Sequence, residues 1–388
     1  MKRGSLLFAL LCVGASATLA QDVDSRVLRV VLRKPGDDGS KAYRIPGLAT
    51  TKPGTLLAVF DIRHDGAGDL PADIDVGLMR STDDGASWSA MRRILDFDKT
   101  EANSRGNGVG DPTILVDSQT GAVFVAALWS RGDRAWNGSG PGLTPDETGQ
   151  FVLTKSTDDG VTWSPPINIT TQVKDPRWRL CFQGPGAGIQ ATDGTLVIPA
   201  QFRDASGTPH SCFLFSRDHG ETWAISPAAI PDKPPTSESQ IAELADGSLL
   251  LTMRDESRGG KRAWARWTWN TPNDSKSAGD KSLGRWSEPW FTVPDPTCMA
   301  SLTRHPRGEL LFSNPNSATQ RIALTIRTSS DDGRSWSDGR LLDPRGCMYS
   351  CLTVLKDGRV GVLYEVAGTL TFARFPLDWV TENRKPSP

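Results

Sequence analysis

Arginines, acidic residues and three tyrosines are the residue types in this sequence that could do chemistry on a substrate. The chain holds only four histidines, and their spacing does not suggest a zinc site. It contains neither a Gly-x-Ser-x-Gly nucleophile elbow nor a phosphate-binding loop. We therefore expect no metal and no cofactor. The histidines are His64, His210, His219 and His305.

The overall charge gives no reason to expect a polyanionic partner. There are 44 Lys and Arg against 45 Asp and Glu, which leaves a formal net charge of −1. Such a chain has no long-range field to draw it to nucleic acid or to a membrane surface. We expect partners of neither kind.

The first of two repeats that must position the reactive residues is a turn motif, Ser-x-Asp-x-Gly-x-x-Trp. In such a turn the Asp accepts hydrogen bonds from backbone amides, the Gly takes a positive φ, and the Trp packs back under the loop. Nothing in the motif can move a proton usefully, so we predict a structural role. The four copies lie at 81–88, 156–163, 216–223 and 329–336.

The second repeat is a turn containing Gly, followed by a run of Leu, Val, Phe and Ile. Such a run is typical of a strand covered on both faces. Six copies begin 50 to 73 residues apart, enough for about four short strands each. The pattern predicts an all-β fold, a six-bladed β-propeller. The strands expected from the six copies cover 55–61, 122–129, 195–202, 248–255, 309–315 and 359–365.

Blades bury their faces against one another, so we expect one cooperative domain over 21–388. The apolar segments 27–32 and 370–375 could close the ring by sharing a blade. Two stretches rich in Gly, Pro, Asp and Ser, 131–150 and 270–284, are expected to be loop insertions. We expect the tail 382–388 to be disordered.

The N-terminus has the pattern of a secretory signal peptide over residues 1–20. Lys2 and Arg3 precede an apolar run too short to span a bilayer, and small residues follow it. We therefore expect a secreted or periplasmic protein without membrane insertion, and a monomer. Its five remaining cysteines are expected to be mostly free and buried, because an odd number cannot pair fully and a domain of this size needs no staples.

The motif Tyr43-Arg44-Ile45-Pro46, together with the four turn motifs, resembles the exo-α-sialidases (neuraminidases) of bacteria, trypanosomes and animals. The resemblance covers 43–365 and is closest to the bacterial enzymes, through Asp61-Ile62-Arg63-His64 and the segment 69–75 that follows. It implies a retaining enzyme that hydrolyses terminal sialic acid from glycoproteins, glycolipids and oligosaccharides.

The resemblance further implies three arginines that clamp the substrate carboxylate. The matching positions are Arg44, Arg254 and Arg321, each at or just after an expected strand. A guanidinium group stays charged at any working pH, and its planar fork matches a carboxylate.

Family members use a tyrosine nucleophile, and the matching residue is Tyr349. Tyr43 belongs to the motif above, and Tyr364 lies inside an apolar run where a core role is expected. A neutral phenol avoids repulsion by the carboxylate on the anomeric carbon. With a pKa near ~10 it needs a base. Glu238 matches the family glutamate, and Glu243 is the alternative.

The general acid/base implied by the resemblance is Asp69, in a Gly-rich loop that could reach over the sugar. Asp61 and Arg63 are expected to line the site. Because a loop shifts register easily, three neighbouring acids remain alternatives for Asp69: Asp65, Asp73 and Asp75.

Asp111 matches the family aspartate that contacts the substituent at C5 of the sugar, although an Asp before Pro112 could also simply cap a turn. Gln201 is a candidate contact for the glycerol side chain. Trp129 could serve as an apolar platform or as a core residue.

Three other functions are alternatives to the hydrolysis of sialosides. A non-catalytic lectin propeller would not need the proposed catalytic and clamp side chains together. A glycosidase that uses two carboxylates would need neither the three arginines nor Tyr349. The six catalytic and clamp residues are Arg44, Asp69, Glu238, Arg254, Arg321 and Tyr349. Transfer of the sialyl group to another sugar, or release of an anhydro product, would use the same residues. Hydrolysis is the default expectation.

Overall fold

The computed structural model describes residues 24–97, 107–270 and 283–382. They form an all-β protein, as predicted. Helix is confined to α1 (Thr170–Val173), α2 (Leu377–Thr381) and a single 3-10 turn at Asp37–Gly39. No helix in these ranges is long and apolar enough to cross a membrane. The expected signal peptide, most of the 270–284 insertion and nearly all of the expected tail lie outside the described residues.

Four of the five sheets contain four or five strands each. The first consists of β2 (Ala42–Thr50), β3 (Leu56–Arg63), β4 (Ile74–Ser81) and β5 (Arg92–Leu95). The second consists of β6 (Gly108–Val116), β7 (Val123–Ser130), β8 (Gln150–Ser156), β9 (Ile167–Asn168) and β11 (Gly186–Ala187). The third consists of β10 (Leu180–Gln183), β12 (Ile189–Gln190), β13 (Leu196–Arg203), β14 (Pro209–Ser216) and β15 (Ala224–Ile225). The fourth consists of β16 (Thr236–Glu243), β17 (Leu249–Asp255), β18 (Lys261–Trp269), β19 (Gly284–Trp286) and β20 (Trp290–Pro294).

The fifth sheet has seven strands because the long strand β24 belongs to two pairings. Up to Gly346 it pairs with β23, and from Cys347 onward it pairs with β25. The expected closure is confirmed, since β1 pairs antiparallel with β26, Leu28 lying opposite Arg374. The strands are β1 (Leu28–Arg33), β21 (Ser301–Arg304), β22 (Leu310–Pro315), β23 (Ile322–Ser329), β24 (Arg340–Val354), β25 (Val360–Val366) and β26 (Thr369–Phe375).

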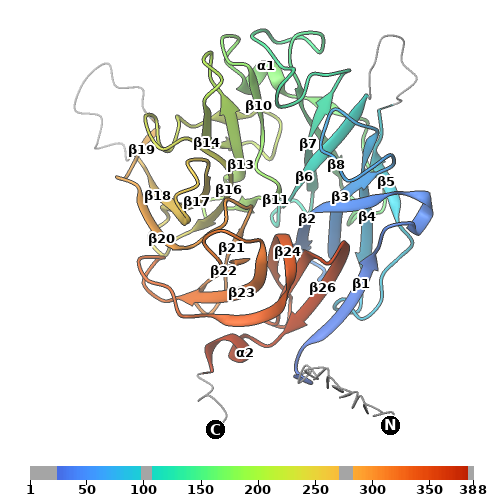
Figure 1. Cartoon of the computed structure of the whole chain (residues 1–388), viewed down its shortest axis with the longest axis vertical. Coiled ribbons are helices and arrows are strands. Elements are labelled where there is room, and N and C mark those ends of the chain that lie inside the picture. Colours follow the sequence, from blue (N-terminus) through green and yellow to red (C-terminus); the bar gives the residue numbers. More distant parts are fainter. Residues whose placement is uncertain (1–23, 98–106, 271–282, 383–388) are drawn as a thin grey trace, which may run out of the picture.

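The sheets follow one another around the molecule in chain order, from blue β2 through green β13 to red β26 (Figure 1). Contacts between sheets join their leading strands: β2 contacts β6 and β24, and β16 contacts β13 and β21. The six apolar repeats form β3, β7, β13, β17, β22 and β25, and their side chains are almost entirely buried. This confirms the expectation of strands covered on both faces.

The four turn motifs, called box turns below, have the predicted geometry. In the first, Ser87 N and Gly85 N donate to Asp83 and to Ser81 respectively, and Trp88 Nε1 donates to the carbonyl oxygen of Gly85 at 3.2 Å. Gly85 has a φ of +82°, and a Cβ there would lie 2.1 Å from the Phe372 ring of β26. Glycine is therefore required twice over, for its conformation and for the close approach of the neighbouring sheet.

Each box turn packs on the sheet that precedes it around the molecule. The glycines of the second, third and fourth box turns face Leu57, Phe124 and Leu250 in the same way. Each box turn thus connects two neighbouring sheets, and the apolar surface buried between turn and sheet stabilises this contact. The expectation about thiols is also confirmed, since the five cysteines among the described residues are free and buried.

Candidate active site

Four strands carry a shift of pairing register near the predicted site residues. On β2 the shift lies between Arg44 and Gly47, and on β6 between Gly110 and Thr113. On β16 it spans 236–239, and on β24 it spans 347–350. We call these four irregularities the cavity bulges. A bulge breaks the in-and-out alternation of a strand and re-aims its side chains, so these positions can present Arg44, Asp111, Glu238 and Tyr349 away from the sheet core.

A cavity of about 260 Å³ opens beside these bulges. It combines five charged side chains with several apolar ones, which suits a small polar ligand carrying an apolar group. Its lining residues are Ile45, Asp69, Leu70, Asp111, Leu128, Ala135, Trp136, Phe182, Gln201, Ser237, Glu238, Arg254, Glu256 and Tyr349.

Tyr349 lies at the wall of this cavity and is bound by two predicted partners. Its phenol donates to Glu238 Oε1 at 2.5 Å, and Arg254 Nη1 donates both to Glu238 Oε2 at 2.8 Å and to the phenol oxygen at 3.2 Å. The side chain is 6% exposed. Burial and the negative charge of Glu238 raise the pKa of Tyr349 well above its usual value, an effect that Arg254 partly opposes. The phenol is therefore neutral at rest.

Arg44 is held on two sides by carboxylates. Its Nε lies 3.2 Å from Glu365 Oε2 and its Nη1 lies 3.2 Å from Asp69 Oδ1. Its guanidinium carbon lies 5.5 Å from the centre of the Tyr349 ring. Glu365 also accepts a hydrogen bond from Ile45 N at 2.8 Å, so this buried acid fixes both the arginine and the bulge that carries it.

Arg321 lies between β22 and β23, one residue before β23 begins. Its Nη2 donates to the carbonyl oxygen of Thr297 at 3.0 Å. Among the residues that the structure describes, no carboxylate pairs with it. Its Nη1 and the Nη2 of Arg44 both approach Met348 Sδ, at 3.9 and 4.0 Å. The two guanidinium groups therefore converge on a weak acceptor directly beside Tyr349.

Asp69 lies in the loop between β3 and β4, as predicted, and its side chain is 72% exposed. Arg63 Nη1 holds it at 2.7 Å in addition to Arg44. Arg63 is itself fully buried, where Asp61 Oδ2 accepts hydrogen bonds from its Nε and Nη2. The buried pair of Asp61 and Arg63 thus anchors an exposed carboxylate at the cavity.

Asp111 has a left-handed backbone with a φ of +57°, and its amide donates to Asp61 Oδ1 at 2.9 Å. Burial, followed by the negative charges of Asp61, Asp69 and Glu238, raises the pKa of Asp111 well above its usual value, which Arg63 only partly offsets. It shares the cavity wall with Leu70, Leu128 and Phe182.

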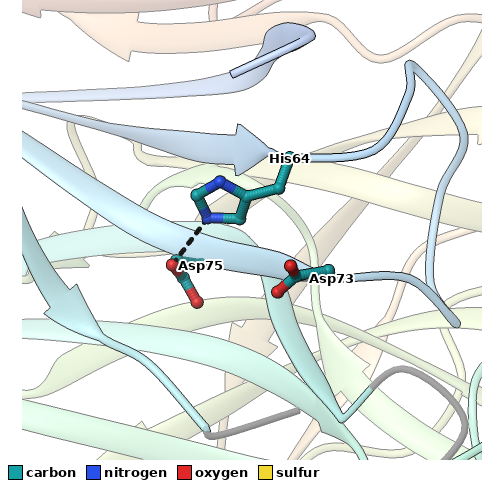
Figure 2. Close-up of side chains that lie close together, drawn as sticks. All are labelled: His64, Asp73 and Asp75. Atoms are coloured by element: carbon teal, nitrogen blue, oxygen red, sulfur yellow. Dashed lines mark hydrogen bonds and ion pairs between the residues drawn. The ribbon is translucent and has the colours of Figure 1, made fainter. Parts of the chain in front are cut away.

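The alternatives for the base and for the acid lie elsewhere. Glu243 accepts hydrogen bonds from Thr192 at the far end of β16 and does not line the cavity. Asp65, Asp73 and Asp75 do not line it either. Figure 2 shows the imidazole of His64 directed at Asp75, to which its Nε2 donates at 2.8 Å, with Asp73 beside them.

His64, Asp73 and Asp75 are the one group among the described residues that could hold a metal ion, with ligand atoms within 4.8 Å of one another. The histidine spacing in the sequence did not suggest this grouping. In the structure the His64 side chain bonds Asp75, and the backbone N of His64 donates to the carbonyl oxygen of Asp73 at 3.1 Å, so the two ends of the Asp69 loop are tied together. Arg93 lies 3.4 Å from the same Asp75 oxygen that His64 contacts.

Of the two remaining candidates, Gln201 lines the cavity and Trp129 does not. Trp129 stacks on Phe97 with the ring centres 4.5 Å apart, so the alternative of a packing role holds for it. Trp136, from the 131–150 loop insertion, supplies the aromatic wall instead. That loop is irregular between β7 and β8, as expected.

Three site residues escaped sequence reasoning: Trp136, Glu256 and Glu365. Glu365 follows Tyr364 in a predicted strand, and Glu256 follows the Arg254 motif by two residues. For the two glutamates a signal was available in the sequence. Each acid lies within or directly after an apolar run, where a buried charge needs a partner.

The comparisons with known proteins agree with this geometry. A domain model described as a BNR repeat-like domain matches residues 54–362. The chain is 44% identical over 355 residues to a sialidase of Bacteroides fragilis (strain YCH46), an alignment covering 87% of this chain and 62% of that protein. It is 35% identical over 360 residues to a sialidase of Micromonospora viridifaciens, covering 89% of this chain and 53% of that protein.

Among solved structures, a Hadza microbial sialidase matches with a TM-score of 0.83 at 43% identity, covering 91% of this chain and 69% of that one. The chain spans only about half to three fifths of the length of the two curated relatives above.

Proposed function

Since the chain belongs to the bacterial sialidase family with BNR repeats, we propose that it is a retaining exo-α-sialidase acting on terminal sialic acid of glycoconjugates. The observation that carries the proposal is the contact of 2.5 Å between the Tyr349 phenol and Glu238 at the wall of a cavity that Arg254 also lines. Arg44 and Arg321 converge on Met348, next to Tyr349 in the chain. A phenol paired with a carboxylate suits attack on an anomeric carbon that itself bears a negative group.

We infer that Glu238 takes the phenolic proton as Tyr349 attacks the anomeric carbon. The negative charge of Glu238 disfavours a phenolate in the resting site, so proton and bond must move together. Arg254, which donates to both groups, stabilises the charge that develops between them. As the new bond forms, the bond to the aglycone breaks and the leaving oxygen takes a proton from Asp69. The product of this step is a covalent sialyl-tyrosine glycoside, which water then hydrolyses with net retention of configuration.

The carboxylate clamp is supported by three sets of free donors. Arg44 Nη2 and Arg321 Nη1 share only the Met348 sulfur, and Arg254 Nη2 contacts no described residue. A substrate carboxylate beside Tyr349 could accept from all three, and charge-assisted hydrogen bonds of this kind are about twice as strong as neutral ones.

Asp69 is the proposed acid/base. Its exposure of 72% lets it meet both the leaving oxygen and incoming water, while Arg44 and Arg63 hold it in place. Asp111, which lines the cavity together with Leu70, Leu128 and Phe182, is the proposed contact of the C5 substituent: the carboxyl group would accept from a polar N–H, and the apolar side chains would contact an acyl group.

We further propose that the fold is a six-bladed propeller in one domain. The switch of β24 from β23 to β25 at Gly346 and Cys347 supports dividing the seven-stranded sheet into two four-stranded blades, the second closed by β1. Export through a cleaved N-terminal segment and a monomeric state remain proposals from the sequence.

Purified protein should release the aglycone from a fluorogenic aryl α-sialoside, with the α-anomer of the free sugar seen first by proton NMR. The methyl ester of the same substrate should be turned over at least about 100-fold more slowly, because an ester cannot make the charged contacts of the clamp. Equal turnover of acid and ester, or first appearance of the β-anomer, would refute the proposal.

A further inference from the structure

Met348 is a reactive side chain beside the proposed clamp that the proposed mechanism does not use. It directly precedes Tyr349 on the cavity bulge of β24. Its Sδ lies 3.9 Å from Arg321 Nη1 and 4.0 Å from Arg44 Nη2. A thioether sulfur is only a weak acceptor. Two charged donors therefore meet at an atom that satisfies neither of them well.

The two arginines differ in how many other acceptors they have. Arg44 is paired with the carboxylates of Glu365 and Asp69. In the part of the chain that the structure describes, Arg321 has instead the carbonyl oxygen of Thr297, which accepts from its Nη2 at 3.0 Å. Hydrogen bonds from a charged donor to an oxygen are about twice as strong as neutral ones. An oxygen atom added at the Met348 sulfur would therefore be held by both guanidinium groups.

Oxidation of methionine adds an oxygen atom at this position. The sulfur gives an electron pair to one oxygen of a peroxide, and the O–O bond breaks. That oxygen stays on the sulfur as a sulfoxide, and the other oxygen leaves with both protons of hydrogen peroxide as water. The sulfur is oxidised by two electrons and the peroxide is reduced by two. An apolar side chain thereby becomes a polar one that carries an oxygen acceptor.

Two of the five methionines that the structure describes have exposed surface, so a small oxidant can reach them. They are Met348 and Met91, both partly exposed, whereas Met79, Met253 and Met299 are buried. Met91 lies between the first box turn and β5, where it packs on the core of that sheet. The chain thus offers a second partly exposed methionine away from the clamp as an internal comparison.

We propose that Met348 is an oxidation site at which a peroxide switches off the carboxylate clamp. The sulfoxide oxygen accepts hydrogen bonds from Arg44 Nη2 and Arg321 Nη1 and so competes with the substrate carboxylate for both. The inference rests on the proposed function for the role of these arginines. Oxidation leaves Tyr349 and Glu238 chemically unchanged, so the loss is one of substrate binding.

The test treats the wild type, Met348→Leu and Met91→Leu with hydrogen peroxide and locates each sulfoxide by peptide mass spectrometry. The kcat/KM for an aryl α-sialoside is compared with that of the same protein before treatment. In the wild type and in Met91→Leu it should fall by roughly 10- to 100-fold as Met348 is oxidised, because hydrogen bonds to charged groups are lost. Met348→Leu keeps the apolar volume without the sulfur, and it should retain its untreated value.

Met348→Gln examines the effect of an oxygen acceptor without any oxidant. Its amide oxygen can accept from the same two arginines. Before any treatment, its kcat/KM should be at least about 10-fold below that of untreated Met348→Leu. Equal values for these two variants would overturn the inference, because an acceptor at this position would then not compete with the substrate.

Two results of the peroxide treatment would also overturn the inference. One is an equal loss in the wild type and in Met348→Leu, which would assign the effect to another group, such as a thiol. The other is a wild type whose Met348 stays reduced, or is oxidised without loss of kcat/KM.

Calorimetric titration with a carboxylate-bearing inhibitor separates this inference from the proposed function. The affinity of the wild type should fall in step with its content of Met348 sulfoxide, and unchanged affinity would overturn the inference. An untreated wild type that turned over no sialoside would remove the proposed function. If its affinity for the inhibitor were still lost on oxidation, Met348 would stand as the oxidation site of a carboxylate-binding protein.

Discussion

The two ends of the sheets use the same strands in opposite ways. Strand register places the first box turn at one end of its sheet, where Thr50, Leu56 and Ser81 lie side by side, and Arg44 at the other, opposite Asp61 and Val76. Box turns repeat one hydrogen-bond pattern in four sheets. The cavity bulges share a position in the sheet but carry a different side chain each time.

The difference teaches how one repeat can serve both stability and chemistry. The box turns have the same residues at the same positions because each one packs on a preceding sheet of similar shape. A cavity bulge is irregular because its residue must point away from the sheet core. Only a break in the in-and-out alternation of side chains along the strand lets that residue contact partners from other sheets. Damage at one end should therefore leave the other intact, and four changes examine this.

Tyr349→Phe should have the largest effect. Removing the phenol oxygen deletes the nucleophile and the acceptor of Arg254, so kcat on an aryl α-sialoside should fall roughly 10³-fold or more. The melting temperature should stay close to that of the wild type, because the ring still packs against Ile45 and Met299. Tyr364→Phe, in the core, is the matched control and should keep its activity. Activity near that of the wild type in Tyr349→Phe would move the nucleophile to another residue.

Trp163→Ala acts at the other end. Trp163 packs partly buried against the core and donates from Nε1 to the carbonyl oxygen of Gly160 at 3.2 Å. Its loss should lower the free energy of unfolding by about 2–3 kcal/mol, measured by urea denaturation. The kcat of the folded fraction at low temperature should be unchanged. Loss of turnover at full stability would contradict the separation of the two ends.

Arg321→Lys should weaken binding of a carboxylate-bearing inhibitor by roughly 10- to 100-fold, because an ammonium group cannot replace a planar fork. The change in kcat should be smaller than the change in affinity. Arg334→Lys, in the fourth box turn, provides the control. Calorimetric titration with the inhibitor measures the affinity of both variants, and turnover of an aryl α-sialoside measures their kcat. Unchanged affinity in Arg321→Lys would take this residue out of the clamp.

The smallest effect concerns pH and the box turns. Hydrogen bonds from Thr222, opposed by partial burial, lower the pKa of Asp218 from 3.8 to about 2. A group with a lowered folded-state pKa contributes stability above the unfolded value, and that contribution is lost as the pH falls from about 4 towards 2. Asp218→Asn should therefore melt a few degrees below the wild type at pH 7, and the gap should narrow below pH 4.

Thermal unfolding at several pH values measures this gap. Asp232→Asn serves as the control, because Asp232 is exposed and forms no hydrogen bond or ion pair with the part of the chain that the structure describes. A gap for Asp218→Asn that stays constant from pH 7 to pH 3 would show that the aspartate acts through shape rather than charge.

The box turns, the six buried strands and the pairing of β1 with β26 could all be predicted from the sequence. Each of these features rests on short-range chemistry: a box turn closes its hydrogen bonds within eight residues, and an apolar run buries itself wherever the neighbouring sheet lies. The resemblance then supplied Arg44, Asp69, Glu238, Arg254, Arg321 and Tyr349. In the structure Asp69, Glu238, Arg254 and Tyr349 line one cavity, whereas Arg44 and Arg321 converge on Met348 beside Tyr349.

Which acids pair with which arginines could not be predicted from the sequence. Glu365 reaches Arg44 across 321 positions of the chain, and the Asp69 loop folds back onto Arg44 and Arg63 of its own sheet. Trp136 replaced Trp129 at the cavity because a loop insertion, whose path no periodicity encodes, folds over the site. The contact of Glu365 with Arg44 joins two separate sheets, so its geometry is set by how the sheets close into a ring rather than by any local pattern of residues.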